Sequence, residues 1–205
     1  MDKAIQTVIE NLEKHNMAGY FVNDKQAFFE LLQTLVPQGA TIGSGDSITL
    51  EQLGVFDFLR GGNYIFHDKF VPNLSAEEKR LLYVKNFSAH SFISGTSAVT
   101  MDGKIFNIDG MGNRVAPMIY GPEQVILVVG KNKIVENVKA AIERTRQVAA
   151  PLDAKRLDFA TPCAALGKCV DCNHEQRICY AFVLLVGQLV KNRIKVIIVN
   201  ENLGY

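Results

Sequence analysis

Short apolar runs alternate with amphipathic helical segments through the first half of the chain, and this alternation constrains its fold more than any other feature. Apolar residues in segment 2–16 recur at the spacing of one helix face. A strand is expected over residues 20–22, and Asp24 can cap a helix over residues 25–36 that Pro37 ends. Repeated strand and helix units predict an α/β fold, with an open and mainly parallel sheet covered by helices on both faces.

The remaining elements follow from similar patterns. A strand over 40–42 passes into a Gly/Ser turn, and a capping box at Ser75 opens a helix over 76–87. The apolar spacing of 133–148 predicts a helix that Pro151 closes. Further apolar runs predict strands over residues 63–67, 104–108, 124–129, 181–186 and 194–199. The strands over 181–186 and 194–199 would finish the sheet, in one arrangement as an antiparallel edge. A helix over 177–189 is the alternative to the strand over 181–186.

Length and composition limit the kind of protein this is. The 205 residues suit one domain, residues 1–205, with its own core. The net charge of +1 provides no general attraction for nucleic acid, and no apolar run reaches the length of a membrane span. Residues 1–16 carry charges throughout and lack the apolar centre of a secretory signal. We therefore expect a cytoplasmic protein without nucleic-acid or membrane partners.

A cluster of polar residues lies between the strands predicted at 104–108 and 124–129. It contains Asn107, Asp109, Asn113 and Arg114, with glycines that let a ligand approach the main chain. A carboxylate, two amides and a guanidinium at one turn favour a polar ligand site in which Arg114 pairs with an anion. The alternative is an ordinary connection with Arg114 on a solvated surface.

Two small polar turns are expected at the same edge of the sheet as this cluster. One is Gly43-Ser44-Gly45, the other is Ser94-Gly95-Thr96-Ser97, and each follows a predicted strand end, where open parallel sheets bind their ligands. We predict a crevice there that binds a small anionic metabolite, either a carboxylate or a phosphate. The predicted binding residues are Gly43, Ser44, Gly45, Thr96, Ser97, Asn107, Asp109, Gly110, Asn113 and Arg114.

All four cysteines lie in segment 161–180, with the spacing C-x5-C-x2-C-x6-C. Such clustering points to a metal site with the ligands Cys163, Cys169, Cys172 and Cys179, which could hold zinc or an iron–sulfur cluster. The alternatives are reduced structural thiols and redox-active thiols or a disulfide. Cys179 borders an apolar run and could be buried there, so Cys163, Cys169 and Cys172 are the better-supported metal ligands.

Several short motifs resemble one family when they are taken in order. They are Thr96-Ser97-Ala98-Val99-Thr100, Asp102-Gly103, Asn107-Ile108-Asp109-Gly110, Gly112-Asn113-Arg114-Val115-Ala116, Gly121-Pro122, Arg193-Ile194-Lys195-Val196 and Asn200-Glu201-Asn202-Leu203-Gly204. In these motifs the chain resembles the LUD domain, a lactate-utilisation domain once catalogued as a domain of unknown function. The resemblance covers nearly the whole chain, and it is specific because many short pieces agree in order.

The resemblance implies both a fold and a role. The fold would be that of the ribose-5-phosphate isomerase and CoA-transferase superfold, an open α/β sheet with a crevice at its strand ends. The role would be in oxidising L-lactate to pyruvate beside iron–sulfur and oxidase-like partners. This chain lacks the C-x2-C-x2-C run of the larger lactate-utilisation subunits, and it is more similar to the short, stand-alone branch with a T-P-C-x5-C-x2-C tail.

Three functions compete at this point. The first is a lactate-utilisation component that binds a small anion, with an iron–sulfur redox partner. The second is an autonomous isomerase or acyl-CoA-transferase-like enzyme, in which Asp109 acts as a general base or Glu201 as a nucleophile. An exposed carboxylate near the last residue is the favoured alternative for Glu201. The third is a metal-binding sensor or scaffold, and association of identical copies is compatible with each function.

Overall fold

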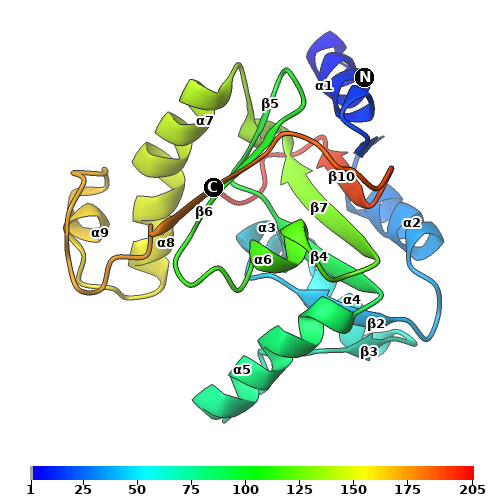
Figure 1. Cartoon of the computed structure of the whole chain (residues 1–205), viewed down its shortest axis with the longest axis horizontal. Helices are drawn as coiled ribbons and strands as arrows, with labels where there is room; N and C mark the ends of the chain where they lie inside the picture. Colours follow the sequence, from blue (N-terminus) through cyan, green and yellow to red (C-terminus); the bar gives the residue numbers. More distant parts are fainter. Residues whose placement is uncertain (1) are drawn as a thin grey trace.

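The computed structural model describes residues 2–205, and a central sheet of parallel strands organises it (Figure 1). The spatial order of its six strands is β1-β10-β7-β4-β2-β3. Their bounds are β1 Ala18–Val22, β2 Thr41–Ser44, β3 Ile65–Phe66, β4 Ser91–Gly95, β7 Gln124–Gly130 and β10 Ile194–Val199. Every pairing is parallel, so all carboxyl ends meet at one edge of the sheet. The prediction of an α/β fold with an open, mainly parallel sheet is confirmed.

Three helices cover one face of this sheet. They are α2 Lys25–Leu35, α3 Ile48–Leu53 and α4 Val55–Gly61. Side chains alternate between the faces of a strand, and in β7 Ile126 and Val128 pack against these helices. The neighbouring Val125, Leu127 and Val129 point to the opposite face. Both sets are fully buried, which explains why β7 reads as a continuous apolar run in the sequence.

The opposite face is covered by helices and by a second, smaller sheet. The helices are α1 Lys3–Lys14 and α6 Ala116–Ile119, and α1 inserts Ile5, Val8 and Leu12 into the core. The second sheet has the order β8-β5-β6-β9, with β9 antiparallel to β6. Its strands are β5 Ala98–Thr100, β6 Ile105–Asp109, β8 Ile134–Val135 and β9 Ala181–Leu185. The sequence predicted helices on both faces but not this second sheet.

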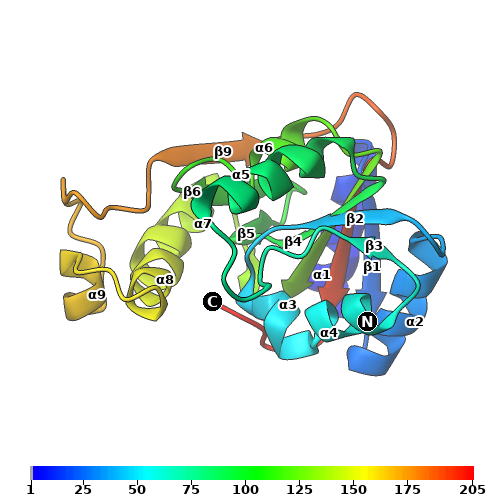
Figure 2. The same ribbon diagram turned by 90° about the horizontal axis from the view of Figure 1, so that it is seen from below.

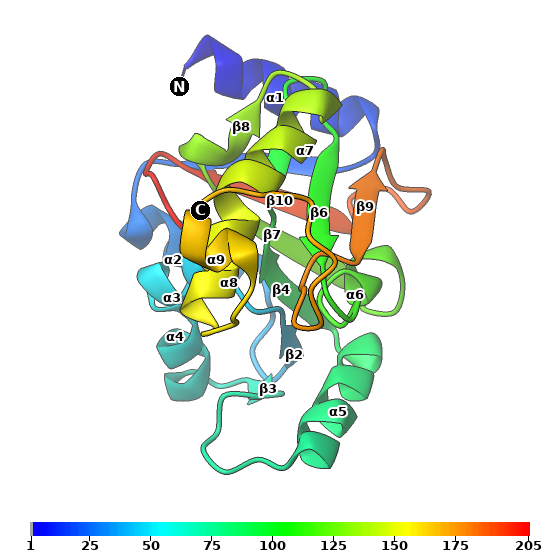
Figure 3. The ribbon, with the colours of Figure 1, turned by 90° about the vertical axis from the view of Figure 1, so that its left-hand side faces the viewer.

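The remaining helices lie around these layers, and Ser75 forms the predicted capping box at the start of α5. Helix α7 leads through η3 into α8, and α8 packs against α9, so that these elements form an arm beside the central sheet (Figures 2 and 3). The bounds are α5 Ala76–Lys85, η1 Asn86–Ser88, η2 Lys131–Lys133, α7 Val138–Arg144, η3 Thr145–Ala149, α8 Ala150–Arg156 and α9 Pro162–Leu166. Within residues 2–205 no helix combines the length and the apolar character needed to cross a membrane.

The helix predicted over 133–148 is wrong at both ends. Ile134 and Val135 form β8, because they complete an edge of the second sheet beside β5. Pro151 does not close the helix, since it lies in the first turn of α8, directly after the π-helical segment η3. The backbone stays helical on both sides of η3, since Arg144, Thr145, Ala149 and Ala150 all have right-handed helical angles. The helical segment that begins with α7 therefore continues through η3 and α8 to Arg156.

The strand predictions for the last two apolar runs hold, but they belong to different sheets. The run at 181–186 contains β9, so the alternative helix over 177–189 is wrong, and β9 is an antiparallel edge of the second sheet. The last strand, β10, is not an edge. It lies between β1 and β7 with parallel pairing to both, because its side chains are apolar on both faces.

Candidate functional site

A cavity of about 620 Å³ lies at the carboxyl edge of the central sheet. Residues 46–48 and 95–97, which follow or end β2 and β4, form one side, and residues 108–111, 113 and 114, which end or follow β6, form a second. The arm and residues 175–178 and 180 of the cysteine segment close the remaining side. This is the edge at which parallel α/β sheets bind ligands, and the volume suits a small molecule.

Arg114 lies on the cavity wall and is held from behind by buried acceptors. Its side chain is 15% exposed. One Nη group donates to the side-chain oxygen of Asn107 at 2.7 Å and the other to the carbonyl oxygen of Ile108 at 2.7 Å. Asn107 is itself fully buried, and its oxygen also accepts from the Ser97 N–H at 3.2 Å. Arg114 is therefore a positioned side chain and not a solvated one.

Close packing of the β2 and β4 turns places Arg114 beside Gly45. A Cβ atom on Gly45 would lie 2.8 Å from Cγ of Arg114 and 2.3 Å from Oγ of Ser94. A Cβ atom on Gly95 would lie 2.3 Å from Oγ of Ser47. The two glycines thus allow approaches that a side chain would prevent.

Asp109 ends β6 and shapes the turn that carries Arg114. Its carboxylate accepts a hydrogen bond from the Gly112 N–H at 2.7 Å and lies 3.4 Å from Nε of Arg114. Gly112 adopts a φ of 83°, a conformation that favours glycine. Asp109 thereby neutralises one side of the guanidinium and fixes its orientation.

Lys133 also lines the cavity, and sequence reasoning missed it. Its side chain comes from η2, directly after β7, and the residue is 4% exposed. Nζ donates to the hydroxyl oxygen of Thr49 at 2.9 Å. Burial, followed by the positive charges of Arg144 and Arg114, lowers the pKa of Lys133 to about 7. The signal was a lysine just after a buried strand, which the predicted helix over 133–148 obscured.

The far wall of the cavity carries a second polar network. Arg156 donates to Asp153 at 2.8 Å and to the hydroxyl of Tyr205 at 2.9 Å, and it lies 3.8 Å from Asp46. The Tyr205 hydroxyl in turn donates to Asp153 at 2.8 Å. Burial, and then the neighbouring Asp153 carboxylate, raises the pKa of Tyr205. Asp153 and Arg156 are neighbours three residues apart on α8, but Tyr205 and Asp46 are distant in sequence and meet them only in the folded chain.

The ten predicted binding residues divide into two groups. Thr96, Ser97, Asp109, Gly110, Asn113 and Arg114 line the cavity. Gly43, Ser44, Gly45 and Asn107 lie outside its lining, and of these Gly45 and Asn107 pack against or hydrogen-bond Arg114 from behind, as shown above. Glu201, the second candidate for catalysis, is exposed after β10 and does not line the cavity. The structure thus brings Asp109 to the cavity and leaves Glu201 outside it.

The cysteine segment was predicted to bind zinc or an iron–sulfur cluster. The thiol of Cys169 accepts from Arg146 at 3.4 Å, that of Cys179 accepts from Arg177 at 3.2 Å, and that of Cys163 lies 3.3 Å from the Thr161 hydroxyl. Among residues 2–205 no three Cys, His, Asp or Glu side chains are grouped so that they could hold a metal ion. The thiols of Cys163, Cys169, Cys172 and Cys179 do not fit a preformed metal site, so we derive no chemistry from a metal.

Comparisons with known proteins agree with this fold. The model of the LUD domain family matches residues 5–199. The chain is also similar to the crystal structure of a DUF162 family protein from Deinococcus radiodurans, with a TM-score of 0.56, 15% sequence identity and coverage of 97% of each chain. A similarity at this identity supports the fold alone. No curated protein matches the chain.

Proposed function

Because the chain belongs to the LUD domain family, we propose that it binds a small anionic metabolite, a carboxylate or a phosphate, in the cavity at the carboxyl edge of its central sheet. The family's name supports lactate or pyruvate as this ligand. It also supports a role in lactate oxidation beside an iron–sulfur redox partner.

The observation that carries the proposal is the position of Arg114. A guanidinium has five N–H groups. Asn107 and Ile108 accept one from each Nη atom, and Nε faces Asp109. Within residues 2–205 the other N–H of each Nη atom has no hydrogen-bond partner, and the side chain lines the cavity. Each of these N–H groups can donate a charge-assisted hydrogen bond to an oxygen of a carboxylate or phosphate.

Neighbouring groups add to the favourable environment for an anion. The hydroxyl-bearing residues Thr96 and Ser97 line the same cavity as Arg114. Lys133 lines it as well, without a carboxylate within ion-pair distance in residues 2–205. An anion entering the cavity therefore meets the guanidinium of Arg114, the amine of Lys133 and two hydroxyl groups, with the Asp109 carboxylate on the Nε side of the guanidinium.

Calorimetric titration of the full chain with L-lactate, pyruvate and ribose 5-phosphate tests the proposal. We expect one of these anions to bind, and Arg114→Ala to weaken its binding. Arg80→Ala is the matched control, because Arg80 is exposed on α5 and outside the cavity lining. The proposal is lost if none of the three ligands binds, or if Arg114→Ala folds and binds them as tightly as the unmodified chain does.

A further inference from the structure

Lys133 has a position in the cavity that anion binding by Arg114 does not explain. It ends η2, three residues after β7, and its side chain reaches the cavity while the residue stays 4% exposed. A long charged side chain is rarely buried to this degree without a partner of opposite charge. Here none of the ion pairs within residues 2–205 includes Lys133.

The contacts of Lys133 suit a neutral amine. Nζ donates to Oγ1 of Thr49 at 2.9 Å, and that hydroxyl donates onward to the carbonyl oxygen of Leu203 at 3.3 Å. The hydroxyl proton is directed away from Nζ, so Thr49 acts as an acceptor. If the Lys133 amine is neutral, one of its N–H groups donates to Thr49, and the lone pair on Nζ stays available to react with a ligand in the cavity.

The charges around Lys133 favour the same form. Arg144 and Arg114 are the charged groups that act on it, and both are positive. Burial and these two cations lower the pKa of Lys133 to about 7, so that about half of the amines are uncharged near neutral pH. A lysine desolvated beside other cations is one of the arrangements that activate an amine as a nucleophile.

We propose that Lys133 is a nucleophile of this cavity and that its amine condenses with the carbonyl carbon of a small 2-oxo acid to form a Schiff base. The inference rests on the proposed function, because Arg114 would hold the carboxylate of the same ligand. A bond forms between Nζ and the carbonyl carbon, and the carbon–oxygen double bond is lost. The oxygen leaves as water with both amine protons, and no oxidant or reductant is needed.

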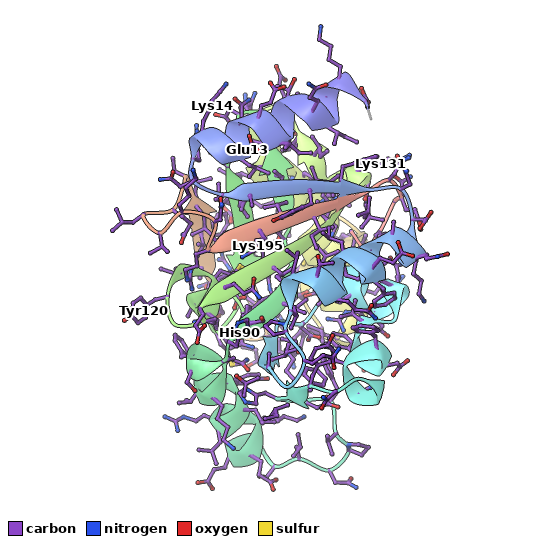
Figure 4. All side chains as sticks on the ribbon, turned by 90° about the vertical axis from the view of Figure 1, so that its right-hand side faces the viewer. Glu13, Lys14, His90, Tyr120, Lys131 and Lys195 are labelled. Atoms are coloured by element: carbon purple, nitrogen blue, oxygen red, sulfur yellow. The ribbon has the colours of Figure 1, made fainter. Side chains whose placement is uncertain are left out.

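Reductive trapping of the full chain tests this proposal. The chain is incubated with pyruvate and sodium cyanoborohydride, which reduces an imine to a stable secondary amine, and the modified peptide is identified by mass spectrometry. We expect one adduct, on Lys133. The variant Lys133→Met should lose it, and Lys131→Met should keep it, because Lys131 is an exposed lysine at the surface two residues away (Figure 4).

The outcomes separate the two proposals. Adducts spread over exposed lysines, or absent although calorimetry detects pyruvate binding, would overturn the role of Lys133 and leave the proposed function standing. Absence of an adduct together with absence of binding for all three ligands of the calorimetric titration would overturn both. Because the adduct is mapped on the unmodified chain, the test does not depend on the folding of Lys133→Met.

Discussion

Arg114 and Asn107 are joined by a hydrogen bond of 2.7 Å, which fixes the guanidinium at the wall of the cavity from a fully buried amide. The same amide oxygen accepts the N–H of Ser97, so one buried side chain connects the end of β4 to the turn after β6. The shape of the cavity therefore depends on contacts behind it as well as on the residues that line it.

Removing Arg114 should cost stability as well as binding. Arg114→Ala loses the hydrogen bonds to Asn107 and Ile108 and leaves the buried oxygen of Asn107 with fewer donors. We expect the free energy of unfolding in urea to fall by about 2 kcal/mol. The exposed control Arg80→Ala should change it by less than about 0.5 kcal/mol. Equal stability of the two variants would show that Arg114 is not held as described.

The close approach at Gly45 gives a second prediction. Gly45→Ala places a Cβ atom against Cγ of Arg114 and the side chain of Ser94, so we expect unfolding in urea to become easier by about 1–3 kcal/mol. Gly61→Ala is the matched control, because a Cβ atom built there meets no atom of residues 2–205 within 4 Å, apart from its chain neighbours and its own helix backbone. A Gly45→Ala variant as stable as Gly61→Ala would contradict the packing of these turns.

The lowered pKa of Lys133 predicts a particular pH dependence. Between about pH 7 and pH 10.5 an unfolded lysine binds more protons than buried Lys133, so this residue makes the free energy of unfolding rise with pH in that window. Relative to Lys133→Met, the unmodified chain should gain about 2 kcal/mol from pH 7 to pH 9. Urea unfolding at both pH values measures this gain. The free energy of unfolding of Lys131→Met should rise with pH as it does for the unmodified chain. An equal rise for Lys133→Met would refute the lowered pKa of Lys133.

Much of the architecture could be predicted from the sequence, since buried parallel strands are apolar on both faces and their helices show clear periodicity. β7, with Val125 to Val129 fully buried, is an example. The second sheet could not be predicted in this way. β8 has only two residues and gives no strong local pattern. β6 and β9 were predicted as strands, but the local pattern of a strand does not show which sheet it joins.

The candidate site was predictable where its residues are adjacent in sequence. Asp109 and Arg114 belong to one short turn, and both line the cavity. Lys133 and Tyr205 reach the same cavity only through the fold, because they follow β7 and β10, whose ends come together at one edge of the sheet. Residues that are brought together in this way have no characteristic spacing in the sequence, so a sequence motif cannot identify them.

The central claim is that the cavity binds an anion, and a change of charge without a change of size tests it most directly. Asn113 is half-buried and lines the cavity, whereas Asn63 is exposed before β3, at the amino edge of the sheet. Calorimetry with the anion that binds among L-lactate, pyruvate and ribose 5-phosphate should show binding to the unmodified chain and to Asn63→Asp, and binding weaker by about tenfold or more, about 1.4 kcal/mol, to Asn113→Asp. Equal affinity of Asn113→Asp and Asn63→Asp would contradict the account.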